Sequence, residues 1–254
     1  MPTPFYHLVL AQDILCDKRL HADIRDFLLT ERSAFLFGNT APDVQTVSGQ
    51  AREETHFFSI DGPNLSSAQQ VMFAKYPELA NGAMLPARRS SFIAGYSIHL
   101  MLDQMWIREI FHPIFGSRAS WKDFSERLFL HNVLRAYLDQ RDYVRLSVDM
   151  EGLLLANRSV YWLPFVESKH LILWRDLLAD QCSPGAVVRT VDVFAERMGR
   201  KPEEFENLLC SEDSIQNQII SRMEPGTLER FRKSAIVRSI ATLNDYLSGD
   251  FERV

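Results

Sequence analysis

The chain has 254 residues, of which 46% are hydrophobic and 24% charged, so it is long enough to bury a sizeable core and has an ordinary globular composition. With 28 Lys and Arg against 33 Asp and Glu, the formal net charge is −5, which disfavours a dedicated nucleic-acid binder. The N-terminal segment lacks the basic residues of a signal peptide, and no apolar run approaches the roughly 18 residues of a membrane span. The three cysteines are far apart and form no CxxC pair, so we expect a protein of the reducing cytoplasm.

Apolar residues recur with the helical period along nearly the whole chain, and no run alternates long enough to predict a strand. In chain order, helices are predicted at Pro4–Cys16, Ala22–Arg32, Ser66–Tyr76, Pro86–Phe111, Trp121–Gln140, Lys169–Ala179, Ala186–Met198, Glu203–Leu209 and Leu228–Leu247. Pro86 suits a first helical turn, and Pro113 is expected to end the same helix.

One long segment, Ser33–Asn64, is predicted to be non-helical and to pack through its phenylalanines. The sequence therefore predicts a single all-α domain over residues 1–254. It would consist of a portion with the candidate site, about 1–140, and a helical extension, about 150–254, with a softer boundary near Asp142 to Asp149.

The pair His99 and Asp103 is the sharpest local feature, because residues four apart on a helix lie on the same face. That face is otherwise aromatic, and burying both groups costs free energy unless they pair or bind a cation. A hydrogen-bonded His and Asp pair in a helical core is the plainer alternative.

Three further residues extend this candidate site. His7 lies in the first apolar helix, Asp43 follows the turn Gly38-Asn39-Thr40-Ala41-Pro42, and His56 lies between Thr55 and Phe57. Each has a structural alternative, as a core histidine, a turn residue and a loop histidine respectively. Together with His99 and Asp103 they supply the imidazole and carboxylate ligands that zinc and related divalent ions favour.

The order of these motifs resembles the zinc-dependent phospholipase C family, which is related to the single-strand-specific zinc nucleases. The motifs are an early helical His, Gly-x-x-Ala-Pro-Asp at Gly38 to Asp43, Thr55-His56-Phe57, and Gly95-Tyr96-x-x-His99-x-x-x-Asp103-x-x-Trp106, and they cover roughly the first 110 residues. The resemblance implies an all-helical fold in which the metal ligands are His7, Asp43, His56, His99 and Asp103. It also implies that Asp43 or Asp103 bridges two ions or orients a bound water.

The chain departs from the family pattern at two points. Secreted members use an N-terminal tryptophan as a ligand, whereas this chain begins with Met1-Pro2. The family also has a later His-x-x-x-Glu motif. In this chain His131 is followed four residues later by Arg135, and an arginine one turn away repels a cation. We therefore expect one or two zinc ions, or another transition metal, rather than a three-ion cluster.

The first functional hypothesis is a metal-dependent phosphoesterase that hydrolyses a small-molecule or lipid phosphodiester with a metal-activated water, with Asp43 and Asp103 as catalytic residues. The second is a catalytically degenerate helical scaffold or binding protein with a structural ion or none. A third is a ligand carrier with an apolar pocket. Homo-oligomerisation is left open.

Two other motifs have structural alternatives that we favour. The basic residues Arg88, Arg89, Arg230, Arg232 and Lys233 could contact a phosphate but are expected to form solvated faces. The aromatic run Tyr161 to Phe165 could line a substrate mouth but is expected to pack in the core.

Overall fold

The computed structural model describes residues 1–61, 66–158 and 161–248, and in this part of the chain helices are the regular secondary structure, with no β-strand. The predicted all-α class is confirmed. The α-helices are α1 (Pro4–Cys16), α2 (Ala22–Thr30), α3 (Arg32–Gly38), α4 (Gln45–Ser48), α5 (Arg52–His56), α6 (Ala68–Lys75), α7 (Ala87–Trp106), α8 (Phe124–Tyr143), α9 (Met150–Leu155), α10 (Ser168–Cys182), α11 (Thr190–Met198), α12 (Pro202–Leu209), α13 (Glu212–Gln218) and α14 (Thr227–Leu247). Short 3₁₀ segments are η1 (Ala41–Val44), η2 (Pro77–Leu79), η3 (Gly82–Met84) and η5 (Ile220–Arg222), and η4 (Ile107–Phe115) is π-helical.

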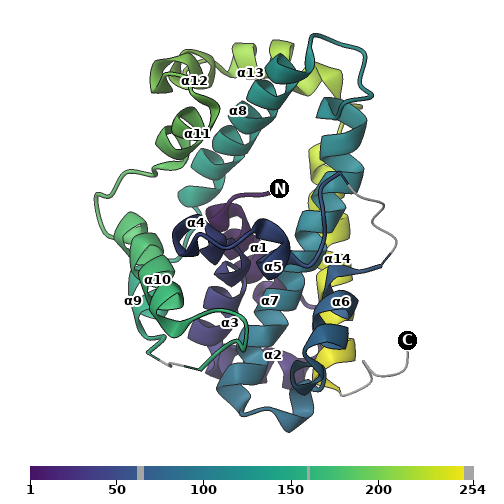
Figure 1. Ribbon diagram of the computed structural model, residues 1–254, viewed down its shortest axis with the longest axis vertical. Helices are drawn as coiled ribbons and strands as arrows, with labels where there is room; N and C mark the ends of the chain where they lie inside the picture. Colours follow the sequence, from purple (N-terminus) through teal and green to yellow (C-terminus); the bar gives the residue numbers. More distant parts are fainter. Residues whose placement is uncertain (62–65, 159–160, 249–254) are drawn as a thin grey trace.

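Two helices, α1 and α7, lie at the centre of the molecule, where α14 runs beside α7 and α8 packs on α1 (Figure 1). In α1 every residue from Phe5 to Ala11 is buried, and in α7 every residue from Ser90 to Leu100 is buried. A helix that is buried on all its faces carries its polar side chains into the core with it. His7 and His99 are therefore buried because of the helices that carry them.

Local sequence explains where several helices begin. Pro4 occupies the first turn of α1, a position that needs no backbone N–H donor. Ser67 and Gln70 form a capping box at the start of α6, and the Asp123 side chain accepts a hydrogen bond from the Glu126 N–H, at 2.9 Å, at the start of α8. These predicted helices are confirmed within a few residues.

The prediction of a non-helical segment from Ser33 to Asn64 is wrong for most of its length. It contains most of α3 and all of η1, α4 and α5, and residues 62–65 lie outside the described residues. None of these helices exceeds 7 residues, too few for a period that is judged over 11 or more residues. The short helices α9 and α13 were not predicted for the same reason.

Pro113 does not end the central helix, contrary to the prediction. The helix passes from α7 into η4, which continues to Phe115 with Pro113 inside it. The Gly116 N–H donates to the Phe111 carbonyl at 2.8 Å, a five-residue step that closes a wider turn than an α-helix has. The wider turn lets the chain continue past a residue that lacks an N–H.

None of the helices in the described ranges has both the length and the apolar character needed to cross a lipid bilayer.

Candidate metal centre

His99 and Asp103 lie one turn apart on α7, at the point where α7 meets α3. A Cβ atom on Gly95 would lie 2.3 Å from the Phe35 carbonyl oxygen, and one on Gly38 would lie 2.0 Å from the Phe92 carbonyl oxygen. The two backbones can approach this closely only because both residues are glycines. The contact brings the Asn39 carbonyl to 2.8 Å from His99 Nδ1.

This hydrogen bond determines which nitrogen of the His99 ring carries the proton when the ring is neutral. Because a carbonyl oxygen only accepts, Nδ1 carries the proton, and the Nε2 lone pair of the neutral ring faces the candidate site. A histidine held through one nitrogen by a carbonyl oxygen has the geometry found around metal ligands.

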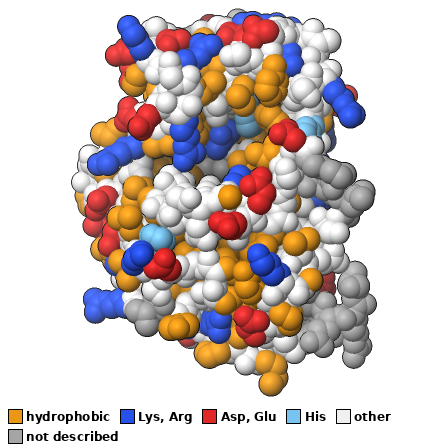
Figure 2. All heavy atoms as spheres, viewed as in Figure 1, with side chains coloured by type: hydrophobic (Ala, Val, Ile, Leu, Met, Phe, Trp, Pro, Cys, Tyr) orange, Lys and Arg blue, Asp and Glu red, His pale blue; other side chains and the backbone are white. Residues whose placement is uncertain are grey.

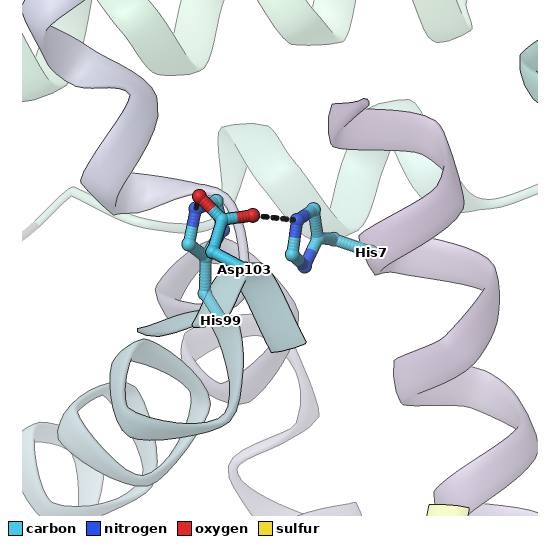
Figure 3. Close-up of side chains that lie close together, drawn as sticks. All are labelled: His7, His99 and Asp103. Atoms are coloured by element: carbon cyan, nitrogen blue, oxygen red, sulfur yellow. Dashed lines mark ion pairs between the residues drawn. The ribbon is translucent and has the colours of Figure 1, made fainter. Parts of the chain in front are cut away.

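His7 enters the same site from α1. Its ring stacks on the His99 ring with centroids 3.9 Å apart, and its Nε2 lies 3.4 Å from Asp103 Oδ1 (Figure 3). Neither ring nitrogen of His7 has a hydrogen-bond partner, and Asp103 Oδ1 also lacks one. Burial, followed by the charge of His99, lowers the pKa of His7 to about 4, so the ring is neutral at pH 7.

Asp43 and His56 complete the cluster from η1 and the last residue of α5. Trp174 on α10 holds the η1 turn by donating its indole N–H to the Thr40 carbonyl, at 2.8 Å. His56 Nε2 lies 3.5 Å from Asp43 Oδ1, 3.4 Å from Asp103 Oδ2 and 3.3 Å from His99 Nε2. All five side chains predicted from the sequence thus converge.

The ring orientation of His56 repeats that of His99. The Thr55 hydroxyl donates to the Arg52 carbonyl at 3.2 Å, so it accepts from His56 Nδ1, which lies 3.0 Å away. Both histidines then present Nε2 lone pairs to each other across 3.3 Å, an arrangement that repels unless a cation or proton lies between them.

The five side chains form two triads of ligand atoms that share His99. One is His7, His99 and Asp103, and the other is Asp43, His56 and His99; within each triad the atoms lie within 4.8 Å of one another. Unpartnered nitrogen and oxygen atoms with inward lone pairs fit a divalent ion with mixed imidazole and carboxylate ligands.

The two carboxylates are ionised in this setting. Burial alone would raise the pKa of Asp103, but the charge of His99 and the close imidazoles of His56 and His7 hold it well below the ordinary value. For Asp43, the effect of burial is likewise outweighed by the neighbouring imidazoles of His56 and His99, so its pKa is also lowered. The pKa of His99 is raised: burial opposes its charge, and Asp103 favours it more strongly.

Arg52 is a site residue that sequence analysis missed. Its Nη2 donates to Asp103 Oδ2 at 2.8 Å, and its guanidinium lies over the Phe58 ring, 4.5 Å from the centroid. Arg52 stands four residues before His56, a spacing that places the two side chains on one helical face. That spacing could have revealed it, had α5 been predicted.

His131 belongs to neither triad. Its Nε2 accepts a hydrogen bond from the Trp106 indole at 2.8 Å, and its ring packs against Phe111 and Phe115. Burial and the nearby charges, including that of Arg135, lower the pKa of His131 well below its ordinary value. The structural interpretation therefore holds for this residue.

The amino group of Met1 is buried within electrostatic range of the cluster. Burial, Arg135 and Arg52 lower its pKa, whereas Asp103 and Asp43 act in the opposite direction.

The other predicted motifs are used for packing. Arg88 and Arg89 donate to the carbonyls of Ala156 and Trp162, and Arg232 pairs with Asp13 and Asp142. Trp162 is buried in a stack on Phe92 with centroids 4.4 Å apart, although Tyr161 is 80% exposed. Neither motif contributes to the cluster.

Comparison of the chain with protein-family models, curated proteins and solved structures finds no match.

Proposed function

We propose that this protein is a metal-dependent hydrolase of phosphoester bonds, of the helical zinc-dependent phospholipase C type. The observation that carries the proposal is the pair of ligand triads that share His99, with buried nitrogen and oxygen atoms that lack hydrogen-bond partners. His7, His56, His99, Asp43 and Asp103 would hold one or two divalent ions, with zinc the best fit to this ligand set. A bound ion would lower the pKa of water and stabilise negative charge on a phosphoryl group.

The two carboxylates have different surroundings and therefore different roles. The Asp103 side chain is 1% exposed and lies beside three imidazoles, so its role is to hold the charge of the ions. The Asp43 side chain is 19% exposed and lines a cavity, so it can reach a water molecule and orient it for attack. Asp43 is the proposed proton acceptor.

The guanidinium of Arg52 supports a second candidate, a degenerate scaffold without catalysis. Its hydrogen bond to Asp103 Oδ2 already compensates one carboxylate without any ion. The two candidates differ in metal content and in turnover.

The first experiment is elemental analysis of the purified protein and of the double variant His56→Ala/His99→Ala. We expect about one or two equivalents of zinc, iron or manganese in the wild type and loss of most of it in the double variant, because both triads lose ligands. His21→Ala is the matched control, since His21 is 66% exposed and belongs to neither triad.

An isosteric variant separates binding from turnover. Asp43→Asn should keep the helical content in circular dichroism and the ion of the His7 triad, but lose hydrolysis of phosphodiester and phosphomonoester substrates. Metal absent from the wild type, even after incubation with each ion, would contradict the hydrolase proposal. Metal bound without any turnover would favour the scaffold.

A further inference from the structure

A cavity of about 120 Å³ lies beside Asp43, between α4, α8, α10, α11 and the residues that begin α1. Figure 2 shows the hollow between the part that carries α11 and the part that carries α4, with Lys or Arg side chains along its upper edge. Its volume is about four times the share of one water molecule in the liquid, enough for a small polar group. Because Asp43 belongs both to this wall and to the metal centre, the two sites adjoin.

The charged residues of the cavity wall are mainly positive. Arg135, Arg189 and Arg197 face a single carboxylate, Asp43, in a chain whose net charge is −5. Within the described residues, none of the three arginines has an ion-pair partner within 4.0 Å. The arginines of this wall therefore outnumber its carboxylate, in contrast to the net negative charge of the whole molecule.

Arg135 is the innermost of these cations. Its guanidinium stacks on the Phe194 ring, with Cζ 4.3 Å from the centroid, and Nη1 donates to Asn132 Oδ1 at 2.8 Å. Its Nε is buried and has no hydrogen-bond partner. Arg135 as a whole is half-buried, and a buried N–H without a partner costs free energy that a bound anion would recover.

The other two arginines lie nearer to solvent. Arg197 on α11 donates to the Thr46 hydroxyl on α4 at 3.3 Å, so it reaches across the mouth of the cavity. Arg189 precedes α11, and its side chain is exposed. Apolar groups such as Trp174 and Leu178 form much of the remaining wall, and an apolar wall strengthens charge pairing by excluding water.

We propose that this arginine cavity binds the phosphate group of a small-molecule substrate, with Arg135 as its main contact and Arg197 and Arg189 at its mouth. The planar guanidinium group matches the oxygens of a phosphate in two parallel hydrogen bonds. Three arginines without an ion-pair partner can therefore recognise a phosphate group. That the bound molecule is a substrate rests on the proposed hydrolase function, whereas the binding of an anion does not. Concentration of the cations in one small cavity favours a small phosphate compound over a polynucleotide, which needs an extended basic surface.

The test measures binding of inorganic phosphate and of phenyl phosphate to chelator-treated protein by isothermal titration calorimetry. In Arg135→Gln we expect the dissociation constant for phosphate to rise about tenfold to a hundredfold, because a charge-assisted hydrogen bond is lost. Arg141→Gln is the matched control: Arg141 lies on the same helix, packs over Tyr137 and does not line the cavity. It should bind like the wild type.

A second variant guards against misfolding. Arg135→Lys keeps the positive charge but not the fork, so its affinity should fall between those of the wild type and Arg135→Gln. Chelator-treated wild type that binds no phosphate, or Arg135→Gln that binds it equally well, would overturn the inference and leave Arg135 a packing residue.

Failure of the two proposals can be told apart on the same preparations. Phosphate binding by a protein that takes up no metal keeps the anion site and removes the hydrolase. Metal binding by a protein that binds no phosphate removes the anion site and leaves the hydrolase proposal standing.

Discussion

Asp139 on α8 is a buried carboxyl group whose protonation should govern how stability depends on pH. It is fully buried, and it accepts hydrogen bonds from the hydroxyls of Thr3, just before α1, and Thr190, the first residue of α11. Burial raises the pKa of Asp139 to about 7; the two hydroxyls and Arg135 act against this rise, and Asp142 adds to it. The group therefore prefers to be neutral in the folded protein.

The sign of the effect follows from linkage. Between the ordinary pKa near 4 and the folded value near 7, the folded protein binds more protons than the unfolded chain, so stability falls as the pH rises. Asp139→Asn removes this loss. Between pH 4 and pH 8, the free energy of unfolding of the variant should rise relative to that of the wild type by on the order of a few kcal/mol. Urea unfolding at matched pH values measures this difference, and a difference that stays constant with pH would contradict the assignment.

At the scale of elements, the contact between α3 and α7 positions most of the candidate metal centre. It brings together the Asn39 carbonyl, His99 and the turn that leads to Asp43. In Gly95→Ala the new methyl group would meet the Phe35 carbonyl at 2.3 Å, so the helices must separate. We expect a loss of about 1–3 kcal/mol in the free energy of unfolding and weaker metal binding.

Gly152→Ala is the control for this prediction. Gly152 lies in α9, and a Cβ atom there meets no atom within 4 Å. The change should leave stability unaltered or raise it by up to about 1 kcal/mol, as alanine does in a helix. Denaturant midpoints of the two variants that shift equally would contradict the role given to the α3 and α7 contact.

At the scale of the whole molecule, the helices after residue 144 support the candidate metal centre. Trp174 on α10 holds the Thr40 carbonyl, and Phe231 on α14 packs edge-on against Trp106 with ring centroids 5.3 Å apart. Arg232 on α14 pairs with Asp13 on α1 and Asp142 on α8. The N-terminal portion therefore shares its core with the C-terminal helices.

A chain ended after Val144 should consequently lack a cooperative unfolding transition and lose metal affinity, because it exposes the α7 and α1 faces that α14 covers. Thermal unfolding followed by circular dichroism compares it with the full chain. A shortened chain that unfolds cooperatively and retains its metal would show instead that residues 1–144 fold alone.

The sequence by itself determined the all-α class, most of the long helices and the five residues that converge at the candidate centre. Helical periodicity is a local property, so the long helices could be predicted from the spacing of apolar residues. The pair His99 and Asp103 could be predicted in the same way, because both residues lie on one helix. His7, Asp43 and His56 were grouped through the order of motifs in a known family. No local spacing joins them.

Only the tertiary structure decided how these residues meet and what surrounds them. The backbone contact at Gly38 and Gly95, the Arg52 hydrogen bond to Asp103 and the cavity that joins Arg135 to Asp43 all link residues far apart in the chain. The short helices between Arg32 and His56 were missed because segments of 4 to 7 residues owe their stability to packing rather than to their own periodicity. Contacts of that kind depend on the whole fold, which is why the charge that faces the metal centre became visible only in three dimensions.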